Sequence, residues 1–235
     1  MDKVNLCIDI GNTSTKALVY KGDKELQYIK NLEIEKFEEL VDQYNPTILV
    51  SKTGKFKELE RKLKSTEILS HNTPIPIKMD YKTPETLGRD RIASAVGAWS
   101  MDKDANWLVI DLGTCLTMDL VVNNEFLGGL ISPGVQMRFK AMDEFTAGLP
   151  LVKYNYSVIF PGKSTEESMQ VGVCQSIMNE IEGYIYKLNK QFPALKIVDC
   201  SSMTLHFDKE VKNEIFARPK LVLEGLNKII NYNAK

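Results

Sequence analysis

Two stretches of the sequence, about a hundred residues apart, carry nearly the same side chains. Residues 4–16 read VNLCIDIGNTSTK, and residues 107–119 read WLVIDLGTCLTMD. Each holds an apolar run that ends near an aspartate, then a turn with glycine and hydroxyl side chains, then a return strand. Glycine and asparagine allow the positive φ of a tight turn, and glycine lets backbone N–H groups approach an anion closely. The pattern therefore predicts two hairpins that each present one carboxylate beside a phosphate-binding turn.

The first hairpin carries further side chains suited to a polyphosphate. Hydroxyl donors occupy positions 13–15, and Lys16 adds a positive charge. Asp9 could hold Mg²⁺ beside the phosphates, directly or through water. One such turn alone is equally well explained as an ordinary connection between strands. Its repetition favours a nucleotide held from both sides, by two turns that face each other across a cleft.

A third group of charged residues lies in the stretch LGRDRIASAVGA at 87–98. Apolar side chains recur there at helical spacing, which predicts a helix over 85–99 with Asp90 and Arg91 near its N-terminal end. The helix dipole and the neighbouring arginine favour the ionised carboxylate, so we expect a lowered pKa for Asp90. On this segment alone, a helix-terminal charge with a surface ion pair is the simpler interpretation, and a catalytic carboxylate is the alternative.

The elements that must position these groups come in an order that repeats. Apolar alternation and turn signals predict strands at 4–10, 15–20, 25–30 and 47–51 and helices at 35–44 and 56–64. Strands are predicted again at 107–113, 115–122, 126–131 and 196–200, with helices after Pro133, at about 165–190 and at 221–230. This order predicts an α/β fold made of two duplicated βββαβα domains, at residues 1–100 and 101–235.

Composition narrows the classes of protein. The chain has 235 residues, 43% of them hydrophobic, which is enough to bury a sizeable core. With 30 Lys and Arg against 31 Asp and Glu, no charge excess points to nucleic acid or an anionic membrane. No leader pattern or membrane-spanning run is recognised, so the cytoplasm is the expected location.

Cysteine and histidine give no sign of a metal site or a disulfide framework. The four cysteines lie far apart, without C-x-x-C spacing, and are expected to be buried thiols. They are Cys7, Cys115, Cys174 and Cys200. His71 and His206 are isolated, so structural roles are expected for both.

Four blocks taken together resemble the type III pantothenate kinase family, within the superfamily of actin, hexokinase and acetate kinase. They are DIGNTSTK at 9–16, LGRDRIASAVGA at 87–98, DLGTCLTMD at 111–119 and GGLISPG at 128–134. The resemblance implies two ribonuclease-H-like domains with ATP in the cleft between them. It also implies phosphorylation of the 4′-hydroxyl of pantothenate, the first step toward coenzyme A.

The resemblance implies roles for single residues. Asp90 would be the base that accepts the hydroxyl proton, and Asp111 would hold a monovalent cation, K⁺ or NH₄⁺. ATP, as its Mg²⁺ complex, would be bound by Asp9, Gly11, Asn12, Thr13, Lys16 and Thr114. Pantothenate would be bound by Tyr81, Gly88, Arg89, Asp90, Arg91 and Thr165.

Simpler interpretations of some of these residues stay open at this point. Tyr81 could be a half-buried loop aromatic, Asp111 a turn cap and Thr165 a helix N-cap. The face of the strand to which Asp119 belongs is not decided by the pattern. In place of the Gly-Gly pair that the family usually has after the strand at 196–200, this chain reads DCSSM, which puts the contacts to adenine in doubt.

Members of the resembled family are dimeric, with the acceptor pocket completed by the neighbouring subunit, so we expect a homodimer. Two other functions remain as alternatives. One is a kinase of the same superfamily that acts on another small molecule, and the other is a non-enzymatic regulatory relative.

Overall fold

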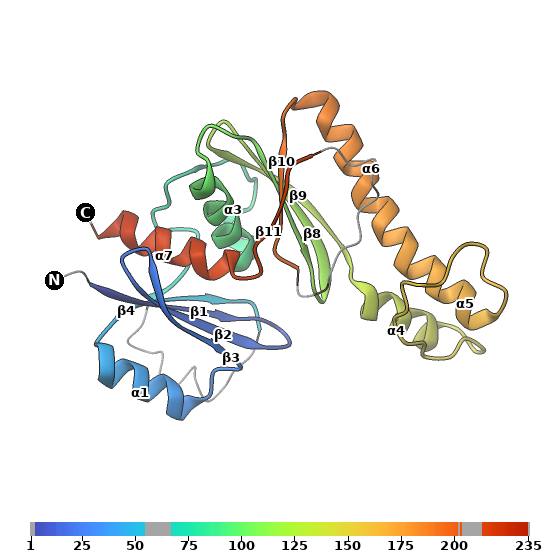
Figure 1. Cartoon of the computed structure of the whole chain (residues 1–235), viewed down its shortest axis with the longest axis horizontal. Helices are drawn as coiled ribbons and strands as arrows, with labels where there is room; N and C mark the ends of the chain where they lie inside the picture. The colour runs from blue at the N-terminus through green and yellow to red at the C-terminus, as the bar shows by residue number, and fades with distance from the viewer. Residues whose placement is uncertain (1–2, 55–66, 202, 204–212, 235) are drawn as a thin grey trace. The chain divides into compact units, whose positions relative to one another are not determined.

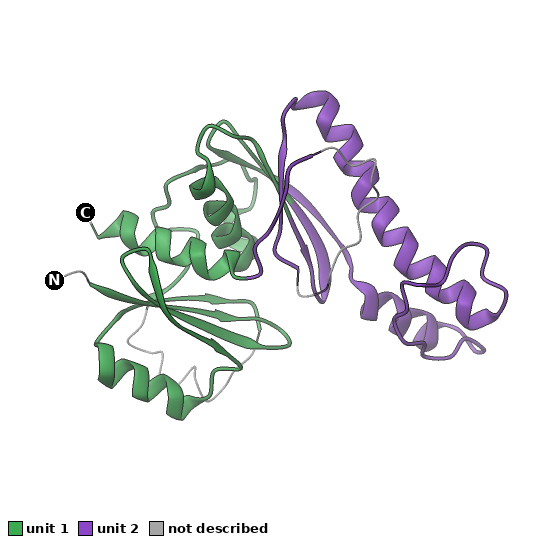
Figure 2. Cartoon of the chain, in the orientation of Figure 1, with its two compact units in different colours: residues 1–109, 119–128, 220–235 green, residues 110–118, 129–219 purple. Residues whose placement is uncertain are grey.

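The computed structural model describes residues 3–54, 67–201, 203 and 213–234. These residues form two compact units (Figure 2). The first unit comprises the described residues within 1–109, 119–128 and 220–235, and the second comprises those within 110–118 and 129–219. The helix predicted at 56–64 and His206 lie outside the described residues.

The first sheet has five strands in the order β3-β2-β1-β4-β5. They are β1 (Val4–Ile10), β2 (Thr15–Lys21), β3 (Lys24–Lys30), β4 (Thr47–Lys52) and β5 (Glu67–Ile68). Strand β1 pairs antiparallel with β2 and parallel with β4. Asp9 therefore lies across from Lys16 on one side and from Ser51 on the other.

Helix α1 (Ile34–Tyr44) covers one face of this sheet (Figure 1). Its Phe37 and Leu40 pack in a core cluster with the alternate residues at positions 6, 8 and 10 of β1. Asn45 ends the helix in the left-handed region, at φ 43°, and Pro46 follows, so the chain leaves the helix there.

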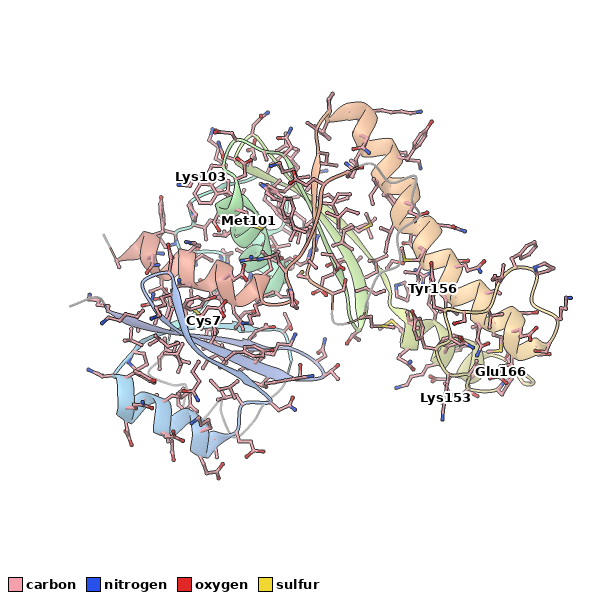
Figure 3. The ribbon with its side chains drawn as sticks, in the orientation of Figure 1. Cys7, Met101, Lys103, Lys153, Tyr156 and Glu166 are labelled. Atoms are coloured by element: carbon pink, nitrogen blue, oxygen red, sulfur yellow. The ribbon has the colours of Figure 1, made fainter. Side chains whose placement is uncertain are left out.

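The other residues of β1 face the opposite side of the sheet, because side chains alternate along a strand. Helix α7 (Leu221–Asn233) lies on that side, and Figure 3 shows Cys7 between β1 and this helix. Asn5 Nδ2 donates to Asn227 Oδ1 of α7 at 2.7 Å and to Asn231 Oδ1 at 2.9 Å. Asp9 belongs to the same face as Asn5 and Cys7.

Helix α3 (Arg89–Met101) packs against α7 through two glycines. A Cβ on Gly225 would lie 1.8 Å from the carbonyl oxygen of Ala93, and a Cβ on Gly97 would lie 2.7 Å from that of Leu221. The backbones of the two helices are therefore in direct contact. A 3₁₀ turn, η2 (Pro84–Thr86), precedes α3, so the predicted helix over 85–99 begins later than expected.

The second sheet has the order β11-β10-β7-β8-β9-β6. Its strands are β6 (Lys78–Met79), β7 (Trp107–Leu112), β8 (Cys115–Val122), β9 (Glu125–Pro133), β10 (Lys196–Asp199) and β11 (Ile215–Ala217). The run β9-β8-β7-β10 repeats the order β3-β2-β1-β4 of the first sheet. The predicted α/β fold with a duplicated strand order is confirmed.

Helices of the second unit follow β9. They are α4 (Val135–Phe145), α5 (Thr165–Gln170) and α6 (Ser176–Gln191). A π-helical turn, η3 (Val171–Gln175), joins α5 to α6, so the long helix predicted at 165–190 is present with one wider turn inside it.

Two further expectations can be compared with the structure. All four cysteines are free thiols, but Cys115 is half-buried rather than buried, because it opens β8 beside the turn. Within the described ranges, no helix is both long enough and apolar enough to cross a membrane.

Candidate active site

The turn of the first hairpin is held by backbone contacts. Gly11 N–H donates to the carbonyl of Ser14 at 3.0 Å, and the N–H groups of Thr53 and Gly54 both donate to the carbonyl of Ile10, at 3.0 and 2.9 Å. A Cβ on Gly54 would lie only 2.0 Å from the Gly11 oxygen, so this close approach requires glycine. The next two residues of the turn, 12 and 13, are exposed and accessible to a ligand.

Asp9, at the end of β1, carries a carboxylate in an unusual state. Its Oδ1 atom is buried and has no hydrogen-bond partner among the described residues. Burial, and then the negative charge of Asp90, raise the pKa of Asp9 to about 6, while Ser51 and Lys16 act in the opposite direction. A buried carboxylate oxygen without a partner is costly, so the site suits a cation or a donor supplied by a ligand.

Asp90 lies in the first turn of α3, after the N-cap Gly88. Its Oδ1 accepts a hydrogen bond from the N–H of Arg91 at 2.8 Å. Burial raises the pKa of Asp90, against the lowering effect of the Arg91 N–H and charge. Our prediction of a lowered pKa was wrong, because the desolvation of the carboxylate outweighs its favourable neighbours.

The guanidinium of Arg91 is not directed at Asp90. Its Nε donates to Asp119 Oδ2 at 2.9 Å and to Oδ1 at 3.1 Å, and its second N–H group donates to Oδ1 at 2.5 Å. Arg91 is 6% exposed and Asp119 1% exposed, so this ion pair is withdrawn from water. The guanidinium carbon also lies 5.9 Å from the ring centre of Tyr81.

Tyr81 is fixed by the strands beside it. Its ring lies 5.9 Å from that of Phe126 on β9, centre to centre. Gly128, with φ +90°, lies beside the ring, and a Cβ there would be in ordinary van der Waals contact with it, at 3.4 Å. Tyr81 is therefore part of a packed cluster around Arg91, and it keeps the partial exposure expected for a residue at a ligand site.

The side chain of Arg89 makes hydrogen bonds to the backbone just before its own helix. It donates to the carbonyl of Leu87 at 2.8 Å and to that of Glu85 at 3.0 Å, across the 3₁₀ turn before α3. This side chain stabilises the approach to the helix that carries Asp90.

The second hairpin is built in a similar way, in the second unit. Gly113 N–H donates to the carbonyl of Cys115 at 2.9 Å, and Gly134 N–H donates to that of Thr114 at 3.1 Å. A Cβ on Gly134 would lie 2.4 Å from the Gly113 oxygen. Asp111, at the end of β7, is half-buried beside this turn.

Ser201, in the DCSSM stretch, makes two hydrogen bonds with the ends of neighbouring strands. Its Oγ accepts a hydrogen bond from the N–H of Leu112 at 2.8 Å, and its own N–H donates to Asp199 Oδ1 at 2.9 Å. The first serine after β10 is thus tied to the strand that carries Asp111.

Thr165 is the first residue of α5 and lines a cavity of about 970 Å³ within the second unit. The N-cap is Ser164, whose Oγ accepts the N–H of Glu167 at 3.1 Å. The alternative interpretation of Thr165 as the N-cap is therefore wrong, and its side chain is exposed.

The structure brings part of the predicted site together in the first unit. The negative charge of Asp90 raises the pKa of Asp9, and Tyr81 lies beside the guanidinium of Arg91, the residue that follows Asp90. Asp111, Thr114 and Thr165 belong to the second unit.

Asp119, which pairs with Arg91, and Ser51, which lies across from Asp9, belong to the same group of side chains, and neither had been assigned a role from the sequence. The sequence does contain one signal for Asp119, because this aspartate lies inside the apolar run CLTMDLVV. An aspartate that is buried with such a run needs a partner.

Comparisons with known proteins identify the family. A model of the type III pantothenate kinase family matches residues 47–187. Type III pantothenate kinase from Phocaeicola vulgatus is 38% identical over 242 residues, covering 99% of this chain and 100% of the relative. The protein of the same name from Cytophaga hutchinsonii is 39% identical over 236 residues, covering 98% and 100%. The chain belongs to the type III pantothenate kinase family.

Membership in the type III pantothenate kinase family confirms the resemblance seen in the four sequence blocks. Among solved structures, the ROK hexokinase from Thermus thermophilus matches with a TM-score of 0.56 and 12% identity, covering 99% of this chain and 100% of that one. At this identity the likeness concerns the fold alone, and it agrees with the duplicated α/β architecture.

Proposed function

We propose that the protein transfers the γ-phosphoryl group of ATP to the 4′-hydroxyl of pantothenate and so catalyses the first step toward coenzyme A. The observation that carries this proposal is the pair of carboxylates in the first unit. Asp90 lies at the start of α3, and Asp9 lies at the end of β1, close enough for its pKa to respond to the charge of Asp90. Asp90 can serve the acceptor alcohol, and Asp9 can serve the phosphates of ATP.

Asp90 is proposed as the base. It would orient the hydroxyl and accept its proton as the oxygen bonds to the γ-phosphorus and the bond from that phosphorus to the leaving ADP oxygen breaks. Phosphoryl transfer depends more on this orientation than on early deprotonation. The raised pKa of Asp90 helps, because a proton acceptor works best when its pKa approaches the working pH.

The first hairpin is proposed to hold the phosphates. Its exposed residues Asn12 and Thr13, the backbone of Gly11 and the charge of Lys16 are the groups available. Asp9 fits Mg²⁺, because its enclosed Oδ1 lacks a partner among the described residues. Bound Mg²⁺ would offset the negative charge of the phosphates.

The second hairpin is proposed to contribute Thr114 to ATP binding and Asp111 to a monovalent cation, K⁺ or NH₄⁺. These two roles rest on the family resemblance. Ser201 supports the strand of Asp111, since it accepts the N–H of Leu112.

For pantothenate, we propose contacts with the cluster around α3 and with Thr165. The side chains of Arg89 and Arg91 already make hydrogen bonds within the protein, so Gly88, Tyr81 and the backbone of the helix start are the more accessible contacts. The guanidinium of Arg91 lies beside the Tyr81 ring, and we propose that its positive charge also meets the pantothenate carboxylate.

A homodimer in the cytoplasm is part of this proposal. Apolar side chains of the second unit support an interface: Phe145 is 80% exposed, Ile159 76% and Phe160 75%. Contiguous apolar surface marks interaction sites, so we propose that these side chains contribute to one.

The test is turnover by the purified protein with pantothenate, ATP, Mg²⁺ and K⁺, compared with Asp90→Asn. We expect pantothenate-dependent ADP formation that falls at least ~100-fold in the folded variant, the scale usual for a positioned acid or base. An N-acetylhexosamine tested in place of pantothenate addresses the alternative kinase. A folded protein with no turnover on any acceptor would favour the regulatory alternative, and equal rates for both proteins would exclude Asp90 as the base.

A further inference from the structure

The buried ion pair between Arg91 and Asp119 calls for an explanation beyond stability. Taking two charges out of water is costly, and replacing a buried pair by apolar residues of similar size is often neutral or stabilising. Arg91 and Asp119 are nevertheless 6% and 1% exposed. Such a pair is better explained by what it orients than by the energy it contributes.

The geometry of this pair restrains the guanidinium strongly. Two nitrogens of Arg91 meet both oxygens of Asp119, at 2.5 to 3.1 Å. A two-pronged contact fixes the plane of the guanidinium as well as its position. The ring of Tyr81 lies 5.9 Å from the guanidinium carbon and limits its movement further.

The restraint extends to the next residue along the chain. Arg91 N–H donates to Asp90 Oδ1 at 2.8 Å, so the backbone that Arg91 fixes also fixes the Asp90 carboxylate. Asp119 therefore acts on Asp90 from β8, 28 positions away in sequence from Arg91. It also keeps the guanidinium occupied. The charge of Arg91 already acts on the Asp90 carboxylate, and without Asp119 the guanidinium could pair with it instead.

We propose that Asp119 is a positioning residue for phosphoryl transfer, which holds the Arg91 guanidinium away from Asp90 and fixes the helix turn that aims the Asp90 carboxylate. This inference rests on the proposed function. It assigns no contact between Asp119 and either substrate.

The experiment compares Asp119→Asn, Asp119→Glu and a matched control, Asp23→Asn. Asp23 is an acid of the same unit whose ion pair with Lys228 is exposed, so its loss should leave turnover unchanged. We expect Asp119→Asn to lower kcat at least ~10-fold while the KM values for ATP and pantothenate change less than ~3-fold, because an orientation effect acts on the transition state. Asp119→Glu, which keeps the charge, should recover part of this loss.

A double-mutant cycle with Asp90→Asn tests whether Asp119 acts through Asp90. In that background, Asp119→Asn should cost less than ~2-fold in kcat, because residues that act as a unit are not additive. Rates are expressed per ATP-binding protein, measured by calorimetry, so that a smaller folded fraction does not imitate the effect. Full additivity of the two losses would overturn the inference.

Asp119→Asn leaves a buried arginine without its partner, so this variant could misfold. A second variant keeps the inference testable in that case. Arg91→Met combined with Asp119→Leu replaces the whole pair by apolar side chains and should fold. We expect this double variant to bind ATP with a kcat reduced at least ~10-fold. Wild-type kcat in the double variant would show that the pair is only structural. A wild-type protein without pantothenate-dependent turnover would overturn the proposed function, and this inference with it.

Discussion

At the scale of single residues, the first unit holds an ionised group in an environment that disfavours its charge. The pKa of Asp9 is raised from 3.8 to about 6, first by burial and then by Asp90. The folded protein therefore binds a proton to Asp9 at a pH at which the unfolded chain does not. Stability from this group increases as pH falls from about 6 toward 4, and the ionised carboxylate destabilises the free protein at neutral pH. A cation bound beside Asp9 would relieve that cost.

Asp9→Asn should therefore make the free protein more stable while abolishing phosphoryl transfer. We expect a gain of about 1–2 kcal/mol at pH near 7.5, which shrinks toward pH ~5, where wild-type Asp9 is protonated. Urea unfolding at both pH values measures the gain, and ADP formation measures activity. Asp23→Asn is the control and should change neither. A variant that is less stable than wild type at both pH values would contradict this argument.

Sequence reasoning singled out two candidate carboxylates, Asp9 and Asp90, but not their surroundings. Asp9 was singled out because a glycine turn is a local pattern, whereas helical spacing only placed Asp90 near a helix start and the family resemblance gave it a role. The direction of the Asp90 pKa was wrong because burial depends on the whole unit, whereas the dipole and Arg91 can be read from neighbours. Asp119 remained unassigned because its partner is 28 positions away, beyond any local pattern.

At the scale of elements, hydrophobic periodicity predicted most of the strands and helices that the structure describes. It could not predict which helices touch. The contact between α3 and α7 depends on Gly97 and Gly225, which a sequence shows only as glycines inside helices. Because α3 carries Asp90 in its first turn, this contact also helps to hold the carboxylate in place.

Gly225→Ala tests that contact. A Cβ at this position would lie 1.8 Å from the Ala93 carbonyl oxygen, so the helices must separate, and we expect a loss of about 2–4 kcal/mol in unfolding free energy. Gly183→Ala in α6 is the matched control, since it has open space, and it should stabilise by about 0.5–1 kcal/mol through helix propensity. Thermal or urea unfolding measures both. Equal effects of the two substitutions would show that the α3–α7 contact is not tight.

At the scale of the whole molecule, the chain does not divide into two consecutive segments. Residues 119–128 and the C-terminal helix α7 both belong to the first unit (Figure 2). The repeat in the sequence predicts duplication, but it does not say against which unit the last helix packs. The domain boundary near residue 100 stays a prediction. Two of the groups discussed above, Asp119 and Gly225, come to the first unit only through these returning segments.

The apolar surface of the second unit leads to a prediction about assembly. Phe145 is 80% exposed at the end of α4 and lines the same cavity of about 970 Å³ as Thr165. An aromatic side chain left this exposed suggests that a second copy of the chain covers it. If the neighbouring copy also completes the pocket for pantothenate, dissociation and loss of turnover should occur together.

Phe145→Glu should therefore convert a dimer into a monomer and lower pantothenate-dependent turnover at least ~10-fold, because a charge replaces an apolar side chain of the expected interface. Tyr186→Glu on α6, where the tyrosine is 64% exposed, is the matched control and should change neither property. Sedimentation measures the assembly, and ADP formation is followed at the same protein concentrations. Wild-type protein that sediments as a monomer with full turnover would contradict the dimer. A dimeric Phe145→Glu would instead place the interface on another surface.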